Sequence, residues 1–118
     1  MDPTITNALA TERTIDITTT GARTGQPHRI EIWFHNVDDR IYITGMPGKR
    51  GWYANLLSDP QMTFHLKQSV TADLDATARP VRGEEKRRVL VPILERLGHS
   101  PKIDDWMDRS PLVEVQFA

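Results

Sequence analysis

The chain has one long stretch with helical periodicity, and it comes late. Across residues 83–97, apolar side chains recur at the spacing of a single helix face. Glu84 and Glu85 suit the first turn of this helix, and Gly98 suits its end. A doubly wound sheet needs a crossover helix between most pairs of strands, so one late helix argues against that fold. The sequence predicts an antiparallel barrel or sandwich covered by this helix.

Alternation of apolar and polar residues predicts the strands of that sheet. A period of two is typical of a strand with one buried face. The predicted strands are residues 11–20, 28–35, 41–44, 62–67, 70–81 and 111–117. Residues 52–57 have the spacing of a short helix, which Pro60 helps to end. Residues 98–110 are expected to be irregular. We predict a loose segment at residues 1–10 and a single domain over residues 11–118.

Composition narrows the class of function. Fifteen basic and sixteen acidic residues give a formal charge of −1, so the chain lacks the positive field of a nonspecific nucleic-acid binder. There is no cysteine, which excludes disulfides and thiolate chemistry and fits a reducing compartment. No apolar run has the length of a signal sequence or membrane span. We therefore expect a cytoplasmic protein without a nucleic-acid partner or membrane span.

Two basic, glycine-containing segments are candidate anion sites. In "GARTG", residues 21–25, the backbone amides, Arg23 and the Thr24 hydroxyl could hold a phosphate or carboxylate. A plain hairpin turn with a solvated arginine is the alternative. In "GMPGKRG", residues 45–51, Lys49 and Arg50 precede the short helix, whose N-terminus attracts anions. A mobile connector is the alternative there.

The remaining residue types argue against several chemistries. The four histidines are scattered and none is paired at the spacing of a metal site, so we expect no metal. No nucleophile elbow, phosphate-binding loop or dinucleotide fingerprint is present. We therefore predict no catalytic side chain. Trp33 lies on the polar face of its strand and could line a ligand pocket, whereas Tyr53 fits a core position better.

Three segments together resemble one known family. "TTTGARTGQP", "WYANLLSDP" and "DDWMDRSPLVEVQF", in this order, are similar to segments of the deazaflavin-dependent nitroreductase and quinone reductase family, from about Ile15 to the C-terminus. The resemblance implies a mainly β (α+β) fold: an antiparallel split β-barrel of six to seven strands, related to the FMN-binding split barrels, with one long and one short helix. It also implies the cofactor coenzyme F-420, an 8-hydroxy-5-deazaflavin that carries hydride.

The resemblance also implies the cofactor-binding residues. The basic turn would hold the phosphate-bearing tail, and the next strand would lie beside the ring. The implied residues are Arg23, Thr24, Gly25, Arg29, Glu31, Ile32, Trp33, Lys49, Arg50, Trp52 and Asn55. Family members commonly have proline where this chain has Glu31, and their substrate-side tyrosines are absent here. Trp33 and Trp106 are thus the expected aromatic residues of a substrate pocket.

These expectations converge on an oxidoreductase. Reduced deazaflavin would pass hydride to a small electron-poor acceptor such as a quinone, an enone or a nitro compound, because the cofactor carries the chemistry. Two alternatives stay open: the same barrel binding FMN instead, and a noncatalytic protein that binds a coenzyme or apolar ligand. The resemblance is also compatible with a homodimer.

Overall fold

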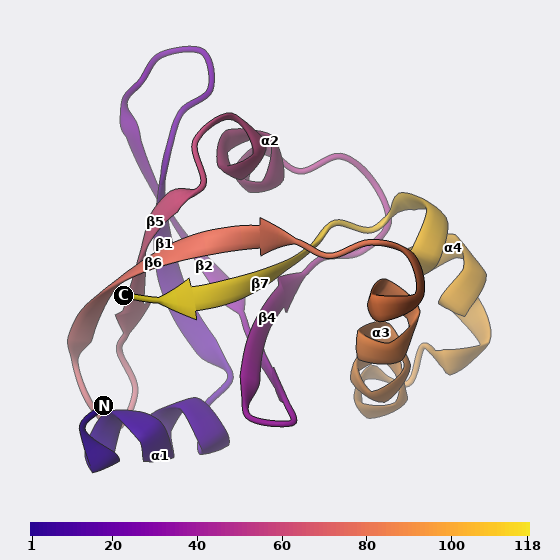
Figure 1. The fold of residues 1–118 in the computed structure, drawn as a ribbon, viewed down its shortest axis with the longest axis horizontal. Helices are drawn as coiled ribbons and strands as arrows, with labels where there is room; N and C mark the ends of the chain where they lie inside the picture. Colours follow the sequence, from indigo (N-terminus) through magenta and orange to yellow (C-terminus); the bar gives the residue numbers. More distant parts are fainter.

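One antiparallel sheet of seven strands forms the body of the protein. The computed structural model describes residues 1–118, and the strands pair in the order β2-β1-β5-β6-β7-β4-β3 (Figure 1). Their bounds are β1 Thr14–Thr20, β2 Pro27–Trp33, β3 His35–Val37, β4 Arg40–Thr44, β5 Gln61–Leu66, β6 Ala72–Pro80 and β7 Leu112–Phe117. The predicted α+β fold with an antiparallel split barrel is confirmed.

The connection between β2 and β3 explains why the sheet curls. These strands lie at opposite ends of the strand order, yet Phe34 alone separates them in the chain. The two edges of the sheet must therefore approach each other. The Phe34 amide donates to the Arg13 carbonyl (2.8 Å), and its side chain is buried. We predicted one strand over residues 28–35; the structure divides it at Phe34 because the chain passes there from one edge to the other.

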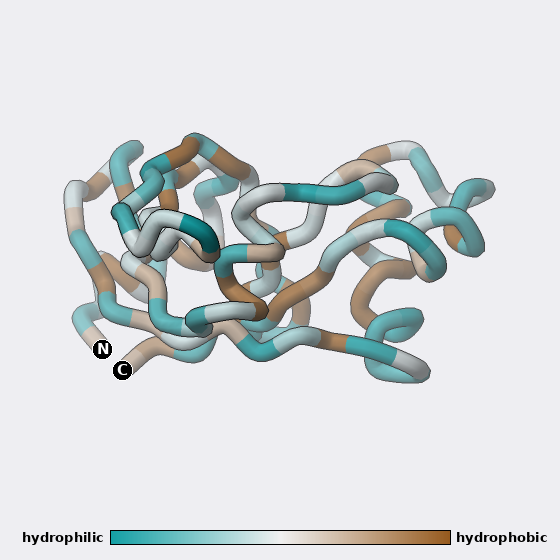
Figure 2. Tube along the Cα trace, turned by 90° about the horizontal axis from the view of Figure 1, so that it is seen from above, coloured by the Kyte–Doolittle hydropathy of each residue, from teal (hydrophilic) through white to brown (hydrophobic).

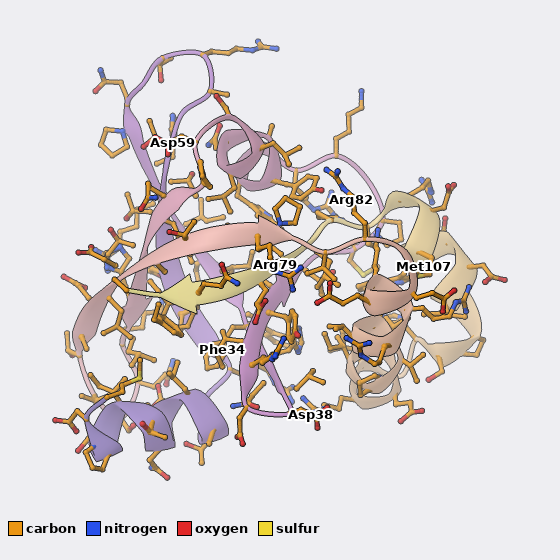
Figure 3. The ribbon with its side chains drawn as sticks, viewed as in Figure 1. Phe34, Asp38, Asp59, Arg79, Arg82 and Met107 are labelled. Atoms are coloured by element: carbon orange, nitrogen blue, oxygen red, sulfur yellow. The ribbon has the colours of Figure 1, made fainter.

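A tight hairpin follows at once. Val37 of β3 pairs with Arg40 of β4, and the two residues between them, Asp38 and Asp39, have φ values of 53° and 64°. Left-handed conformations at both central positions are typical of a turn whose twist matches that of the strands. Asp38 lies at the tip of this hairpin (Figure 3).

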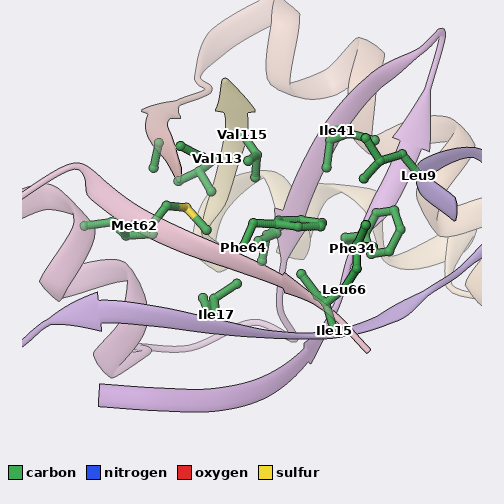
Figure 4. Packing of buried hydrophobic residues seen from close by; sticks show 14 of the residues in the cluster. Leu9, Ile15, Ile17, Phe34, Ile41, Met62, Phe64, Leu66, Val113 and Val115 are labelled. Carbon is green, nitrogen blue, oxygen red and sulfur yellow. The ribbon is translucent and has the colours of Figure 1, made fainter. Parts of the chain in front are cut away.

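The concave side of the sheet encloses the main apolar core. Ile15 and Ile17 of β1 point inward, as their alternation predicts, and meet side chains from β5, β6, β4 and β7 (Figure 4). The Phe64 ring makes edge-to-face contacts with Phe34 and Phe117, at centroid distances of 5.4 and 5.2 Å. Burying these large rings supplies much of the energy that holds the curled sheet together.

A second apolar cluster joins the helices to the outside of the barrel. α3 (Gly83–Leu97) packs Val89, Leu90, Ile93 and Leu94 against Tyr42 and Leu112. Strand β4 is thus buried on both faces: Ile41 and Ile43 face the barrel, and Tyr42 faces α3. Seen from above, α3 and α4 (Ile103–Arg109) form a lobe beside the barrel (Figure 2). No helix has the length and apolar character needed to cross a membrane.

Two helices correct the sequence-based prediction. Residues 1–10 are not loose: α1 spans Pro3–Thr11, begins at an Asp2 cap that accepts from the Thr4 amide (2.7 Å), and buries Ala8 and Leu9. Within the segment expected to be irregular, a short 3₁₀ turn at Ser100–Lys102 leads into α4. With α2 (Gly51–Ser58), which matches the predicted short helix, the chain has four α-helices rather than two.

An ion-pair network fixes the start of α3 on the sheet. The Arg79 guanidinium of β6 donates from Nε and Nη2 to Glu114 Oε1 on β7 (3.0 and 2.8 Å) and from Nη1 to Glu85 Oε1 on α3 (3.0 Å). The Glu114 side chain is 9% exposed. The Arg79 hydrogen bond is the main cause that lowers the pKa of Glu85. Arg79 is therefore the main ion-pair partner of the buried Glu114 carboxylate and also holds Glu85 at the start of α3.

Arg79→Ala should lower the free energy of unfolding by about 2–3 kcal/mol, because it leaves the Glu114 carboxylate buried without its main partner. Urea unfolding followed by tryptophan fluorescence measures this change. Arg87→Ala is the matched control: Arg87 pairs only with the exposed Asp104, so its loss should cost under about 0.5 kcal/mol. Equal effects of the two substitutions would contradict the assigned role of Arg79.

Candidate functional site

The glycine turn between β1 and β2 has a fixed backbone. The Gly21 amide donates to the Gln26 carbonyl (2.8 Å), and the Gly25 amide donates to the Gly21 carbonyl (2.9 Å). Gly25 has φ +69°, a conformation that favours glycine. At Gly21 space is the constraint, because a Cβ there would lie 2.7 Å from His28 Nε2 and 2.8 Å from Thr24 Oγ1. Each glycine is thus needed for a different reason.

Asn55 of α2 ties this turn to the short helix. Its Oδ1 accepts from the Ala22 amide (3.0 Å), and its Nδ2 donates to Thr19 Oγ1 (3.1 Å). Thr19 is buried at 3% exposure, so the bridge is anchored in the sheet. Both ends of the side-chain amide are thus engaged, the oxygen by the turn and the nitrogen by the sheet. Asn55 therefore positions the turn against α2.

A cavity of about 520 Å³ lies between the turn and α2. Four of the predicted cofactor residues line it: Arg23, Thr24, Trp52 and Asn55. The prediction did not include the other lining residues, which are Thr19, Gly21, Ala22, His28, Ile30, Gly51 and Ala54. His28 and Ile30 could have been found, since strand alternation places them on the inward face and the register pairs them with Thr19 and Ile17.

Unpaired hydrogen-bond donors surround this cavity. The amides of Arg23 and Thr24 make no hydrogen bond within the chain, and the Arg23 guanidinium has no carboxylate partner. On the other side, α2 begins at Arg50 without a side-chain cap, which leaves the first-turn amides of Gly51 and Trp52 free. Helix N-termini carry a partial positive charge. The cavity is therefore equipped for an anionic group.

Three predicted residues, Arg29, Glu31 and Trp33, lie on the other face of the sheet. The register pairs Arg29 with Thr18 and Glu31 with Asp16, on the side away from Ile30. Arg29 binds Asp16 (3.0 Å), and Lys67 bridges Asp16 and Glu31. The Lys67 hydrogen bond is the main cause that lowers the pKa of Asp16. The charge of Glu31 is thus compensated by Lys67, away from the cavity.

Trp33 and Ile32 occupy the end of the same strand. Trp33 is 48% exposed on the outer face, with the Arg13 guanidinium 5.2 Å from its ring centroid. Ile32 faces inward and packs against the barrel core. Because β2 is the edge strand, only its β1 side is paired within the sheet. Its free edge leaves backbone groups of residues 31–33 open to a ligand.

The last predicted residues do not line the cavity. Arg50 folds back on its own connector and donates to the carbonyls of Lys49 and Met46 (both 2.9 Å). Lys49 is exposed and makes no hydrogen bond through its side chain. Trp106 is 2% exposed in the second apolar cluster beside His99. As the structure stands, Trp106 offers no surface to a substrate.

Asn55→Ala should lower the free energy of unfolding by about 1–2 kcal/mol, since it leaves the Ala22 amide and Thr19 hydroxyl without partners. Hydrogen exchange at the Ala22 amide should also be faster in this variant. Asn55→Asp keeps an oxygen for that amide, so it should lose less stability and retain more protection. Unchanged exchange at Ala22 in the alanine variant would show that Asn55 does not hold the turn.

Known structures share this fold. A conserved hypothetical protein from Mycobacterium tuberculosis superposes with a TM-score of 0.78 at 24% identity, covering 99% of this chain and 81% of the other. An F420-H2-dependent reductase gives 0.68 at 21% identity, with coverages of 89% and 95%. The heme storage protein HutZ from Vibrio cholerae gives 0.72 at 18% identity, with coverages of 99% and 89%. At these identities the likeness establishes the fold alone.

A family model establishes more than the fold. The model described as F420H(2)-dependent quinone reductase matches residues 2–116, almost the whole chain. The match spans the glycine turn, α2 and the C-terminal strand, the three segments from which the resemblance was inferred. It confirms the predicted family, its oxidoreductase class and coenzyme F420 as its cofactor. The chain belongs to the F420H(2)-dependent quinone reductase family.

Proposed function

We propose that this protein binds coenzyme F420 in the cavity between the glycine turn and α2, and reduces a small electron-poor organic acceptor. The observation that carries the proposal is the convergence of Arg23 with free backbone amides from both sides of one cavity. An anionic coenzyme tail needs such donors, and charge-assisted hydrogen bonds are the strong ones.

The chain's own residues divide the binding task. Arg23, Thr24 and the amides of the turn hold the anionic tail, and Gly25 lets the backbone take the necessary path. The first turn of α2 and Trp52 form the opposite wall. The free edge of β2 at Glu31, Ile32 and Trp33 offers backbone hydrogen bonds to the ring, while Lys67 keeps the Glu31 carboxylate on the outer face. Gly51 leaves the cavity wall open beside Trp52.

Catalysis in this proposal rests on positioning. When bound, the reduced deazaflavin supplies the hydride. The protein fixes the ring and excludes water from one side of it, and hydride transfer to such an acceptor requires no nucleophilic side chain. Quinones, enones and nitro compounds accept hydride without prior activation by an enzyme nucleophile. We propose this class as the substrate, with quinones first because the family is named for them.

Binding of the coenzyme tests the proposal directly. Calorimetric titration should show saturable binding of F420, and Arg23→Ala should weaken it by about 10- to 100-fold, the loss of a charge-assisted hydrogen bond. Arg29→Ala is the matched control, because Arg29 lies on the outer face bound to Asp16 and should change the affinity less than about twofold. Arg29→Ala acting as strongly as Arg23→Ala would move the site to the other face.

The two alternative functions, an FMN-binding barrel and a noncatalytic binding protein, predict different outcomes in binding and oxidation assays. Binding of FMN in preference to F420 would assign the chain to the flavin-binding barrels. Tight binding of F420 with no oxidation of the reduced coenzyme by a quinone series would assign a noncatalytic carrier. The proposal requires that the protein bind F420 and that a quinone oxidise the bound reduced coenzyme. The absorbance of the oxidised coenzyme, which returns during the reaction, measures this oxidation.

We also propose that the protein is a homodimer that packs against the outer face of β2 and leaves the free edge of this strand to the coenzyme. The strand is exposed at six of its seven positions, and Trp33 on its outer face is a large apolar side chain at 48% exposure. Exposed apolar surface of this kind is typical of protein contacts. One structure with this fold is described as a domain-swapped dimer.

Light scattering after size exclusion should give twice the chain mass, and Trp33→Glu should shift the measured mass to that of the monomer. A wild-type monomer at micromolar concentration would contradict this.

A further inference from the structure

A second cavity lies at the other end of the barrel. Its volume is about 390 Å³, and it shares no residue with the cavity at the glycine turn. Residues at the end of α1, the β2–β3 junction, the β3–β4 hairpin and the end of α3 line it, and Figure 1 shows where these elements lie. Its lining residues include Glu12, Arg13, His35, Asn36, Asp39 and Arg96. Nothing in the proposed reductase function uses this set.

Among the residues that line this cavity, His35 is a nearly buried titratable group. His35 is only 6% exposed, and its ring makes no hydrogen bond within the chain. The ring nitrogens are therefore open to a ligand or to water in the cavity. Burial lowers the pKa of His35 to about 4, and the charges of Arg13 and Arg96 contribute to this. The ring is therefore neutral at pH 7 and lies near two cations.

Neither arginine forms an ion pair, although Glu12 and Asp39 line the same cavity. Arg96 donates from Nη1 to the Asn36 carbonyl (3.0 Å), which leaves most of its guanidinium donors free. Arg13 rests on the Trp33 ring and has no ion-pair partner. Glu12 Oε2 accepts from the Ser69 amide (3.2 Å) and the Ser69 hydroxyl, whereas its Oε1 is buried without a partner. The Asp39 backbone amide donates to Asn36 Oδ1 (3.0 Å), which leaves the Asp39 carboxylate itself without an ion-pair partner.

We propose that this cavity is a second ligand site, which binds the phosphate or carboxylate group of a small anion through Arg13, Arg96 and His35. Two guanidinium groups match an oxyanion in charge and geometry, and an imidazole N–H supplies a third donor. The two cavities share no residue, and sulfate binding can be measured in the absence of the coenzyme.

An anion beside the imidazole favours its protonated form. Binding must therefore raise the pKa of His35, and the anion must bind more tightly as the pH falls toward that pKa. Glu12 and Asp39 also face the cavity, and their protonation in acid would strengthen anion binding as well. The His35 ring itself has to be observed to separate these contributions.

The test uses sulfate, whose charge is constant across this pH range. Nuclear magnetic resonance titration of the histidine rings, with and without saturating sulfate, should show the pKa of His35 rising by about one unit or more. His65 and His99, which lie outside both cavities, are the references, and His28 reports separately on the first cavity. Phosphate, glycerol phosphate and succinate then distinguish a phosphate ligand from a carboxylate ligand.

Substitutions test which side chains bind the sulfate. Arg96→Gln and Arg13→Gln should each weaken sulfate binding, read at His35, by about tenfold. Arg87→Gln removes an arginine from the same helix outside the cavity and should leave it unchanged. A His35 pKa that moves in sulfate no more than that of His65 would overturn the proposal, and this wild-type measurement does not depend on any variant folding. Equal sulfate affinity in wild type and Arg96→Gln would overturn it too.

Discussion

The single-residue link between β2 and β3 constrains the rest of the structure. Because these strands form opposite edges of one sheet, the sheet has to curl until Phe34 can belong to both. The Phe34 ring then packs on Phe64 inside the barrel, and its amide bonds to the chain entering β1. This closure directs the β1–β2 turn to one end of the barrel and the residues around the junction to the other. Each end carries a cavity lined by at least one arginine that has no ion-pair partner.

At the first end, one side chain does most of the positioning. Asn55 joins a buried threonine, the glycine turn and α2, so the free amides of both segments face the same space. Arg23 adds a full charge but no structural contact. The arrangement separates the residue that shapes the site from the residue that attracts the ligand. In the proposed function, this separation would let a small barrel hold an anionic coenzyme rigidly.

Much of this was predictable. Period-two alternation located the strands, and the apolar stripe placed the long helix at residues 83–97, as observed. α4 was missed because Ile103, Trp106 and Met107 stand in a polar stretch, although their spacing fits a helix. For the site, the sequence identified the turn but grouped Arg29 and Glu31 with Ile32, whose side chain lies on the opposite face. The return of Arg50 onto its own loop depends on tertiary geometry that no local pattern encodes.

The central claim is that the glycine turn and the N-terminus of α2 together hold the coenzyme. The most direct measurement is a map of backbone amide chemical shifts on adding F420 to the isotopically labelled protein. The account predicts the largest changes at residues 21–26 and 51–55, with smaller ones along the free edge of β2. Changes concentrated around Arg13, His35 and Arg96 instead, or spread over the outer face at Arg29 and Lys67, would contradict it.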